Sequence, residues 1–328
     1  MSIKKNRILI VDAYNLFIRN YVADPSICAD GNPCGGNKGF LKSLQKVSRE
    51  SGPIHKIIVV WDGSGGSLRK RKINSEYKEG RAPIKLNRSV HNLSEEEEKL
   101  NKINQFVRLA DYLNLMPLIQ FVFENVEADD VIARICNLQS LKNNIKIIVS
   151  SDKDFIQLCN KETILLRPVQ KEILNESRIV KEYGIHPQNF ALARAIAGDK
   201  SDNLEGVRGV GLATIAKRIP FLQDSKSFTI DDVISHCEEH KGELKIYNDI
   251  VASKEIIKMN YKLMQLYVPN MSPTVSKAIK ETIQNFEPMF SQTQITHKMV
   301  IDGFTDYNWD SLFQTFRFIV AESKRVEN

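Results

Sequence analysis

Residues 8–12 have the sequence ILIVD, an unbroken apolar run that ends in an aspartate. Three further runs share this character: IIVVW at 57–61, LIQFV at 118–122 and IKIIVS at 145–150. Continuous, β-branched runs of this length are typical of strands that are covered on both faces, whereas half-exposed strands alternate apolar and polar residues. The four runs therefore predict a mostly parallel sheet, and the helical patterns between them predict an α/β fold.

Three helical patterns separate these runs: GFLKSLQKVSRE at 39–50, KLNKINQFVRLADYLN at 99–114 and DDVIARICNLQSLK at 129–142. Beyond about residue 180 the strand pattern stops, and helical periodicity broken by glycines takes over. The last stretch combines the loop-like YVPNMSPTVS with WDSLFQTFRFIVAES, which is typical of an amphipathic helix. We therefore expect three units, which are an α/β unit at 1–182, a helical region at 183–265 and a helical extension at 266–328.

Composition and charge narrow the class of protein. The chain has 328 residues, and its 46 basic and 40 acidic side chains leave a net charge of +6. This mild excess permits the binding of polyanions without requiring it. The five scattered cysteines, with no CxxC pair, argue for a reducing compartment and against a disulfide framework. The N-terminal apolar run is too short for a secretion signal or a membrane span, so we expect a soluble, cytoplasmic protein without a membrane partner.

Acidic residues follow the predicted strands directly. Asp12 ends the first run, Asp62 follows the second, and Asp152 comes just after the fourth. Because parallel strands end at one edge of the sheet, where ligands bind in open α/β folds, we expect these side chains to meet there. The motifs EADD, SSDKDF and the glycine-flanked GDKSDN complete a set of nine candidates: Asp12, Asp62, Glu127, Asp129, Asp130, Asp152, Asp154, Asp199 and Asp202.

Nine carboxylates on one edge would repel one another unless cations lay among them. Carboxylate oxygens and water are the ligands that Mg²⁺ or Mn²⁺ prefers, and the sequence has no matching set of histidines and cysteines for zinc. A single aspartate after a strand is usually a turn former or a helix cap. The whole set instead favours two metal ions, the arrangement that cleaves phosphodiesters.

The stretch GVRGVGLATIAK at 206–217 supplies a second signal. Gly206, Gly209 and Gly211 bracket a tight turn before a helix that is expected to begin near Leu212. The free N–H groups of that turn and helix form a cup for one phosphate, and Lys217 follows within reach of the flanking backbone. The alternative is a glycine-capped linker between packed helices.

A basic segment at 67–91 begins shortly after Asp62 and carries only two acidic residues. We expect it to be an exposed insertion whose cations and Tyr77 bind single-stranded nucleic acid, where a base stacks on the ring. A solvated linker is the more common fate of charge-rich loops, but the imbalance of charge argues against it here. The basic residues are Arg69, Lys70, Arg71, Lys72, Lys78, Arg81, Lys85 and Arg88.

Six motifs occur in an order and at spacings that resemble the 5′-nuclease superfamily of flap endonucleases and 5′→3′ exonucleases: VDAYN, WDG, EYKEGR, EADD, SSDKDF and GDKSDNLEGVRGVG. The resemblance spans about residues 7–220 and is closest to stand-alone bacteriophage enzymes of the ribonuclease H type. It implies a PIN-like, mostly parallel twisted sheet flanked by helices. It also implies a helical arch at about 64–100 and a helix-hairpin-helix within 183–265.

The resemblance also implies roles for individual residues. A first metal would be surrounded by Asp12, Asp62, Glu127, Asp129, Asp130 and Asp152. A second would be held by Asp154, Asp199 and Asp202 with Asp152 nearby, so that Asp152 and Asp202 are essential for catalysis. Lys78 and Arg81 would contact the scissile phosphate at the base of the arch. Residues 206–217 would grip duplex DNA and, as in some members, hold a monovalent cation such as K⁺.

The resulting expectation is a monomeric, metal-dependent 5′→3′ exonuclease or flap endonuclease. It would remove RNA primers or 5′ flaps from branched, nicked or RNA-primed duplexes during replication, with ribonuclease H activity as a further possibility of the family. A contact of residues 266–328 with a sliding clamp or a single-strand DNA-binding protein is a guess. The alternatives are a non-catalytic binder of branched DNA and an unspecific ribonuclease of the related PIN fold.

Overall fold

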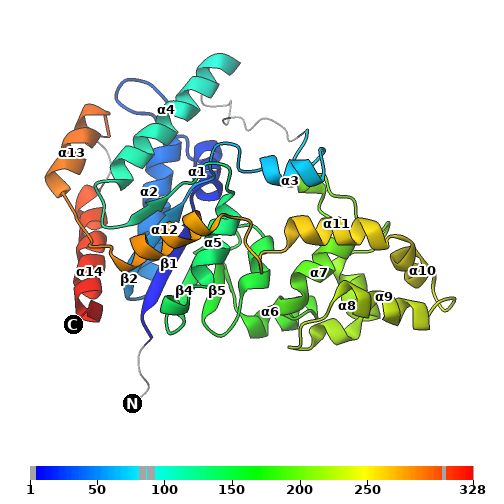
Figure 1. Ribbon diagram of the computed structural model, residues 1–328. Helices are drawn as coiled ribbons and strands as arrows, with labels where there is room; N and C mark the ends of the chain where they lie inside the picture. Colours follow the sequence, from blue (N-terminus) through cyan, green and yellow to red (C-terminus); the bar gives the residue numbers. More distant parts are fainter. Residues whose placement is uncertain (1–4, 81–85, 87–92, 305–307, 328) are drawn as a thin grey trace.

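A computed structural model describes residues 5–80, 86, 93–304 and 308–327 (Figure 1). Its centre is a six-stranded sheet in the order β3-β2-β1-β4-β5-β6, in which only the last pair is antiparallel. The strands are β1 (Arg7–Asp12), β2 (Ile54–Val60), β3 (Ile119–Phe121), β4 (Ile145–Val149), β5 (Thr163–Arg167) and β6 (Glu172–Leu174). The predicted mostly parallel α/β sheet is confirmed.

The first four strands match the predicted apolar runs, and the sheet buries both of their faces. Along β1, Ile8 and Ile10 belong to the core on one side, whereas Leu9 and Val11 belong to the core on the other. Strands β5 and β6 were not predicted. β6 is a three-residue strand at the edge of the sheet, and β5, which lies between β4 and β6, alternates buried and half-buried residues, so neither has the apolar run that marks the central strands.

Helices cover both faces of the sheet. On one side the core includes α1 (Ala13–Ala23), α2 (Gly35–Glu50), α4 (Glu95–Leu113), α13 (Gln292–Ile301) and α14 (Trp309–Glu327). On the other side it includes α5 (Ala128–Cys136), α6 (Glu176–Tyr183), α7 (Pro187–Ala197), α8 (Leu212–Arg218), α9 (Ile230–Glu239), α10 (Lys245–Ala252), α11 (Lys254–Met264) and α12 (Pro273–Gln284). The short helix α3 (Leu68–Ile73) lies beyond the strand ends (Figure 1).

The helix α1 was missed from the sequence, and α2 begins at Gly35 rather than near Gly39. Gly35 and Gly39 allow α2 to approach α1 closely. A Cβ atom at Gly35 would lie 1.9 Å from the carbonyl oxygen of Asp24, and one at Gly39 would lie 2.7 Å from the Asn20 side chain. The glycines are therefore packing positions inside a helix.

The C-terminal stretch is more closely integrated than its sequence suggested. Residues 267–276 were expected to be a loop, but α12 begins at Pro273, with Ser272 as its N-cap, and buries Ile279 and Ile283 beside α5. The predicted helix at 309–323 is confirmed as α14. It packs along β2 and α2, where Leu312 and Phe316 are buried. Among the described residues, no helix is both long and apolar enough to span a bilayer.

Candidate active site

The nine predicted carboxylates all lie beyond the carboxyl ends of the parallel strands or on the turns beside them. Asp12 ends β1 and caps α1, accepting the Asn15 N–H at 3.2 Å, while Asp62 follows β2. Glu127, Asp129 and Asp130 open α5, where Glu127 is the N-cap residue. Asp152 and Asp154 follow β4, while Asp199 caps and Asp202 ends a one-turn 3₁₀ helix after α7.

One group of three carboxylates is compact enough to hold a cation. Among the described residues, Asp154, Asp199 and Asp202 each place a carboxylate oxygen within 4.8 Å of the others. The 199–204 turn is closed by reciprocal hydrogen bonds of 2.8 Å between the backbones of Asp199 and Leu204. Hydrogen bonds from the Ser201 N–H and hydroxyl fix the Asp199 carboxylate further.

The remaining carboxylates are anchored separately. Asp12 accepts the Ser150 hydroxyl at 2.8 Å, and Asp62 accepts the Ala128 N–H at 2.9 Å, which joins β2 to the start of α5. Asp152 accepts the Asp154 N–H at 2.8 Å. Asp130 accepts the Asn270 N–H at 2.7 Å, so this buried carboxylate also ties α5 to the segment before α12.

Burial raises the pKa of several of these carboxyl groups. It raises the pKa of Asp12 to about 7, and the charges of Asp62 and Asp152 add to the effect. Burial likewise raises the pKa of Asp154 to about 7, with Asp152 as the next cause. The pKa of Asp152 is raised by burial and by Asp202, and that of Asp129 by burial and Asp152. Asp152 therefore interacts with both groups of carboxylates.

Three cationic side chains offset part of this charge. Lys70 and Lys78 place their Nζ atoms 2.5 and 2.7 Å from the two oxygens of Glu127. Although burial opposes its ionisation, these two cations hold the pKa of Glu127 below its usual value. On the other side, the Arg194 guanidinium contacts Asp154 at 3.0 Å and Asp199 at 2.5 Å.

Arg194 was not predicted as a site residue. It lies in the last turn of α7, five residues before Asp199, so the segment ARAIAGD brings it back onto the same turn. Its proximity to the GDKSDN motif was the only signal in the sequence, and a basic residue near a helix C-terminus has a common alternative explanation in the helix dipole.

The basic segment differs from its prediction. Lys70 and Tyr77 were expected to be exposed, but they are only 7% and 2% exposed. The Nζ atoms of Lys70 and Lys78 lie 5.6 and 5.0 Å from the centre of the Tyr77 ring, which shares an apolar cluster with Leu204. The ring is therefore not available for stacking on a base in this structure. Arg69, Arg71 and Lys72 are exposed on α3, whereas Arg81, Lys85 and Arg88 lie outside the described residues.

The predicted glycine turn lies between α7 and α8. Gly209 has a φ of +76°, and Gly211 is the N-cap residue of α8. A cavity of about 690 Å³ is lined by residues between 197 and 211. A neighbouring cavity of about 710 Å³ is lined by Arg208, Arg218 and Lys245, among others. Lys217 is exposed on α8. This region therefore combines the start of a helix, whose first N–H groups have no partner within the helix, with cations.

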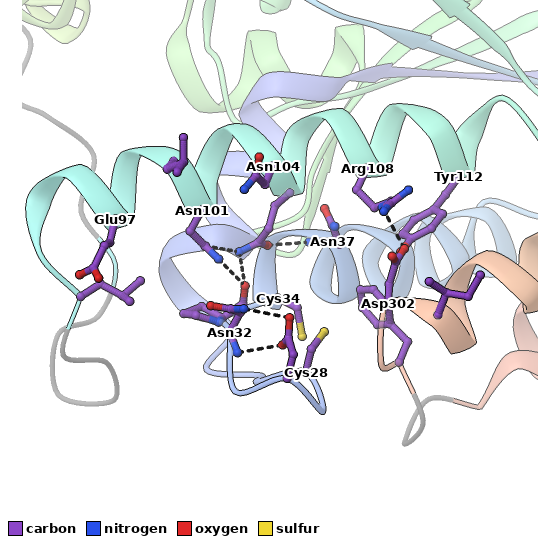
Figure 2. Close-up of a pocket in the computed structure, with 17 residues that line it drawn as sticks. Cys28, Asn32, Cys34, Asn37, Glu97, Asn101, Asn104, Arg108, Tyr112 and Asp302 are labelled. Atoms are coloured by element: carbon purple, nitrogen blue, oxygen red, sulfur yellow. Dashed lines mark hydrogen bonds and ion pairs between the residues drawn. The ribbon is translucent and has the colours of Figure 1, made fainter.

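A further pocket of about 390 Å³ lies under α4 and contains none of the nine carboxylates (Figure 2). Its polar side chains are largely engaged with one another. Asn101 and Gln105 both donate to the Pro33 carbonyl, at 3.0 and 2.6 Å, and Asp302 accepts from Tyr112 and Arg108. This pocket is therefore separate from the acidic site.

A family model described as the 5′-3′ exonuclease, N-terminal resolvase-like domain, matches residues 7–184. The chain belongs to this family. The match covers β1 to α6 and with them seven of the nine carboxylates; Asp199 and Asp202 lie beyond it. The predicted family is thereby confirmed, and with it the prediction of a 5′ nuclease at family level.

Individual relatives of this exonuclease family member are consistent with the family match. The chain is 28% identical to the 5′-3′ exonuclease of Aquifex aeolicus over 79% of its own length and 81% of that protein. It is 27% identical to the thermostable DNA polymerase I of Thermus thermophilus over 80% of its length, but it spans only 29% of that polymerase. The bacteriophage T5 flap endonuclease, solved with DNA and metal ions, shares the fold with a TM-score of 0.63 and 18% identity, covering 97% of this chain and 100% of that one.

Proposed function

We propose that this chain is a metal-dependent 5′ nuclease that hydrolyses phosphodiesters near the 5′ ends of branched, nicked or RNA-primed duplexes. The observation that carries the proposal is the meeting of nine carboxylates with Lys78 at one edge of the sheet of a 5′-3′ exonuclease family member. The name of the Aquifex relative and the DNA and metal ions in the T5 structure support the same reading. The two substrate classes that follow from this proposal are 5′ flaps and RNA primers.

The acidic site fits divalent metal ions of the Mg²⁺ or Mn²⁺ type. Its donors are carboxylate oxygens, and burial without sufficient counter-charge raises the pKa of several of them. Asp154, Asp199 and Asp202, with Asp152 adjacent, would hold one ion. Asp12, Asp62, Glu127, Asp129 and Asp130, again with Asp152, would surround the other. Bound ions of this kind supply an activated water and stabilise the leaving oxygen.

The protein's own cations have a separate task. Phosphoryl transfer is catalysed mainly by positioning and by groups that stabilise negative charge developing on the phosphate. Lys78 is suited to this because its Nζ atom is held at the carboxylates by Glu127, at 2.7 Å, rather than free in solvent. Arg81 is proposed as its partner at the scissile phosphate, from the match to the EYKEGR motif.

Duplex DNA would be held at the glycine turn, which follows the turn of Asp199 and Asp202. Gly209 and Gly211 leave the backbone open to a phosphate, since a Cβ atom at either would have nothing within 4 Å, whereas Gly206 packs against Ala197; Lys217 and Arg218 follow on α8. Contacts of this kind grip the phosphate backbone without reading sequence and weaken with salt. A monovalent cation such as K⁺ at this turn, and a sliding-clamp or single-strand-binding-protein contact through residues 266–328, are subsidiary proposals.

The test uses 5′-labelled flap, nicked and RNA–DNA hybrid substrates with the full chain in Mg²⁺, in Mn²⁺ and in EDTA. We expect cleavage in either metal and none in EDTA, and the product lengths will separate exonuclease from flap endonuclease activity. The variant carrying Asp152→Asn and Asp202→Asn should bind the flap but leave it uncut. A wild-type chain that binds flaps without cutting any substrate would instead support the alternative of a non-catalytic branched-DNA binder.

A further inference from the structure

We propose that Asn203 is a positioning residue that sets Lys78 against the carboxylates. The inference rests on the proposed nuclease function and deepens it. Two turns, one carrying Lys78 and one carrying Asp199 and Asp202, come from segments more than 120 residues apart in the sequence. Asn203 lies where they touch.

Two hydrogen bonds join these turns. The Asn203 side-chain amide donates to the carbonyl oxygen of Glu76 at 3.1 Å. The Lys78 N–H donates to the carbonyl oxygen of Asp202 at 2.9 Å. The bonds run in opposite directions between neighbouring residues, so together they fix both the separation of the two turns and their relative rotation.

Backbone conformation explains why an asparagine suits this position. Asn203 and Lys78 both have left-handed backbones, with φ of +58° and +57°. Residues other than glycine rarely adopt this backbone conformation, but asparagine tolerates it well. A lysine has no such tolerance, so its conformation must be maintained by its surroundings. Within the turn, the Glu79 N–H donates to the Glu76 carbonyl oxygen at 2.9 Å. The backbone bond to Asp202 and the bond from Asn203 to Glu76 join the Lys78 turn to the second turn.

The two turns also pack against each other through apolar side chains. Tyr77, next to Lys78, packs in one cluster with Leu204, next to Asn203. Each of the two is 2% exposed. The Lys78 side chain then extends over the Tyr77 ring to Glu127, which it reaches at 2.7 Å. The position of the Lys78 ammonium group thus depends on a turn whose far side is held by Asn203.

The arrangement assigns Asn203 a role that acts through Lys78. Its amide contacts the backbone of Glu76 rather than a carboxylate of the acidic site, so it is not itself a catalytic residue. Its loss should leave Lys78 and the carboxylates present but less well aligned. Misplacing a charged group at a reaction centre lowers the rate of the chemical step more than it lowers substrate affinity.

A double-mutant cycle tests this. Asn203→Gly keeps the left-handed backbone and removes only the amide, while Lys78→Ala removes the group it is proposed to position. Single-turnover cleavage of a 5′ flap is measured for the wild type, both single variants and the double variant. Flap affinity in EDTA and the thermal midpoint are measured in parallel. Lys171→Gly, which replaces another left-handed residue in the β5–β6 turn, is the matched control.

We expect Asn203→Gly to slow cleavage about three- to tenfold, as the loss of one hydrogen bond would, with flap affinity close to that of the wild type. In the Lys78→Ala background the same change should have almost no further effect, since the group it positions is gone. Lys171→Gly should leave the rate unchanged. Equal losses in both backgrounds, or no loss from Asn203→Gly in the wild type, would overturn the inference. A wild type that cuts no flap would instead count against the proposed function.

Discussion

The guanidinium of Arg194 lies against the carboxylate of Asp154, with its Nε and Nη2 atoms at 3.1 and 3.0 Å from one oxygen. Arg194 also reaches Asp199, so a single cation bridges two members of the compact acidic group. The same two carboxylates are proposed to bind a metal ion. An internal cation therefore occupies a position for which an external cation must compete.

Replacing Arg194 with glutamine should accordingly have opposite effects with and without metal. In EDTA the unpaired carboxylates should lower the free energy of unfolding by about 1–3 kcal/mol, less than for a fully buried pair because all three groups keep some solvent contact. In Mn²⁺ much of this stability should return, and calorimetry should show about tenfold tighter binding of Mn²⁺, or ~1.4 kcal/mol.

Arg178→Gln is the matched control, because Arg178 pairs with Glu172 at 3.1 Å but is 46% exposed. It should change the free energy of unfolding by less than about 0.5 kcal/mol and leave Mn²⁺ binding alone. Weaker Mn²⁺ binding by Arg194→Gln would show that the arginine supports the metal rather than competing with it.

The pH dependence of stability follows from the raised pKa values of Asp12 and Asp154. Each rises from 3.8 to about 7, so the folded chain binds more protons than the unfolded chain between these limits. Stability in EDTA from these groups is therefore fully present below about pH 4 and is lost as the pH rises to about 7. Mg²⁺ should reverse the trend, since it binds the deprotonated carboxylates.

Urea denaturation at several pH values checks this, with Asp12→Asn as the comparison. Asparagine is as good an N-cap as aspartate, so the variant should keep the start of α1 while losing one titrating group. The fall in stability between about pH 4 and about pH 7 should be shallower for the variant in EDTA. If wild type and variant show the same slope, burial does not raise the pKa of Asp12 as described.

The placement of the acidic residues could be expected from the sequence because strand ends and motif order locate them, while their role as metal ligands stays a prediction. The parallel sheet brings Asp12, Asp62 and Asp152 to one edge whatever the details of packing, so their convergence follows from topology. The internal cations could not be predicted in the same way. Burial of Lys70 depends on how α3 folds back over Glu127, and the contact of Arg194 depends on the turn after α7. These are tertiary contacts that leave no periodic pattern in the sequence.

Glycines serve two different purposes in this chain, close packing and special backbone conformations. The helix was expected to begin only near Gly39, yet Gly35 already lies within it, and both glycines allow two helices to touch. Gly206, Gly209 and Gly211 suggested a turn, and the turn is present. A glycine can serve close packing or a special backbone conformation, and the sequence alone does not separate the two uses.

The basic residues of α3 are either buried or exposed, and substituting one of each kind should affect the stability of the protein differently. Lys70 is buried and paired with Glu127, whereas Lys72 is exposed two residues later. Lys70→Met should lower the free energy of unfolding by about 2–4 kcal/mol, because it leaves Glu127 with one cation instead of two. Lys72→Ala should cost less than about 0.5 kcal/mol. Urea denaturation of the two variants in EDTA makes the comparison, and equal costs would show that the buried pair contributes nothing.

The glycine turn offers a final pair of substitutions that separate folding from DNA binding. A Cβ atom at Gly206 would lie 2.1 Å from the carbonyl oxygen of Ala197, whereas one at Gly211 would have nothing within 4 Å. Gly206→Ala should therefore lower the free energy of unfolding by about 1–3 kcal/mol or more, as overpacking does. Gly211→Ala should cost about 1 kcal/mol or less, as a poorer N-cap residue.

If the open space at Gly211 is where a phosphate approaches, its methyl group should weaken the binding of duplex DNA even though the protein stays folded. Fluorescence anisotropy with a labelled duplex at two salt concentrations measures this, beside thermal denaturation of both variants. Lys217→Ala should weaken binding as well and reduce its salt dependence, since one phosphate contact is lost. Wild-type affinity for Gly211→Ala would place the duplex elsewhere on the surface, and the cavity lined by Arg208, Arg218 and Lys245 would be the next region to substitute.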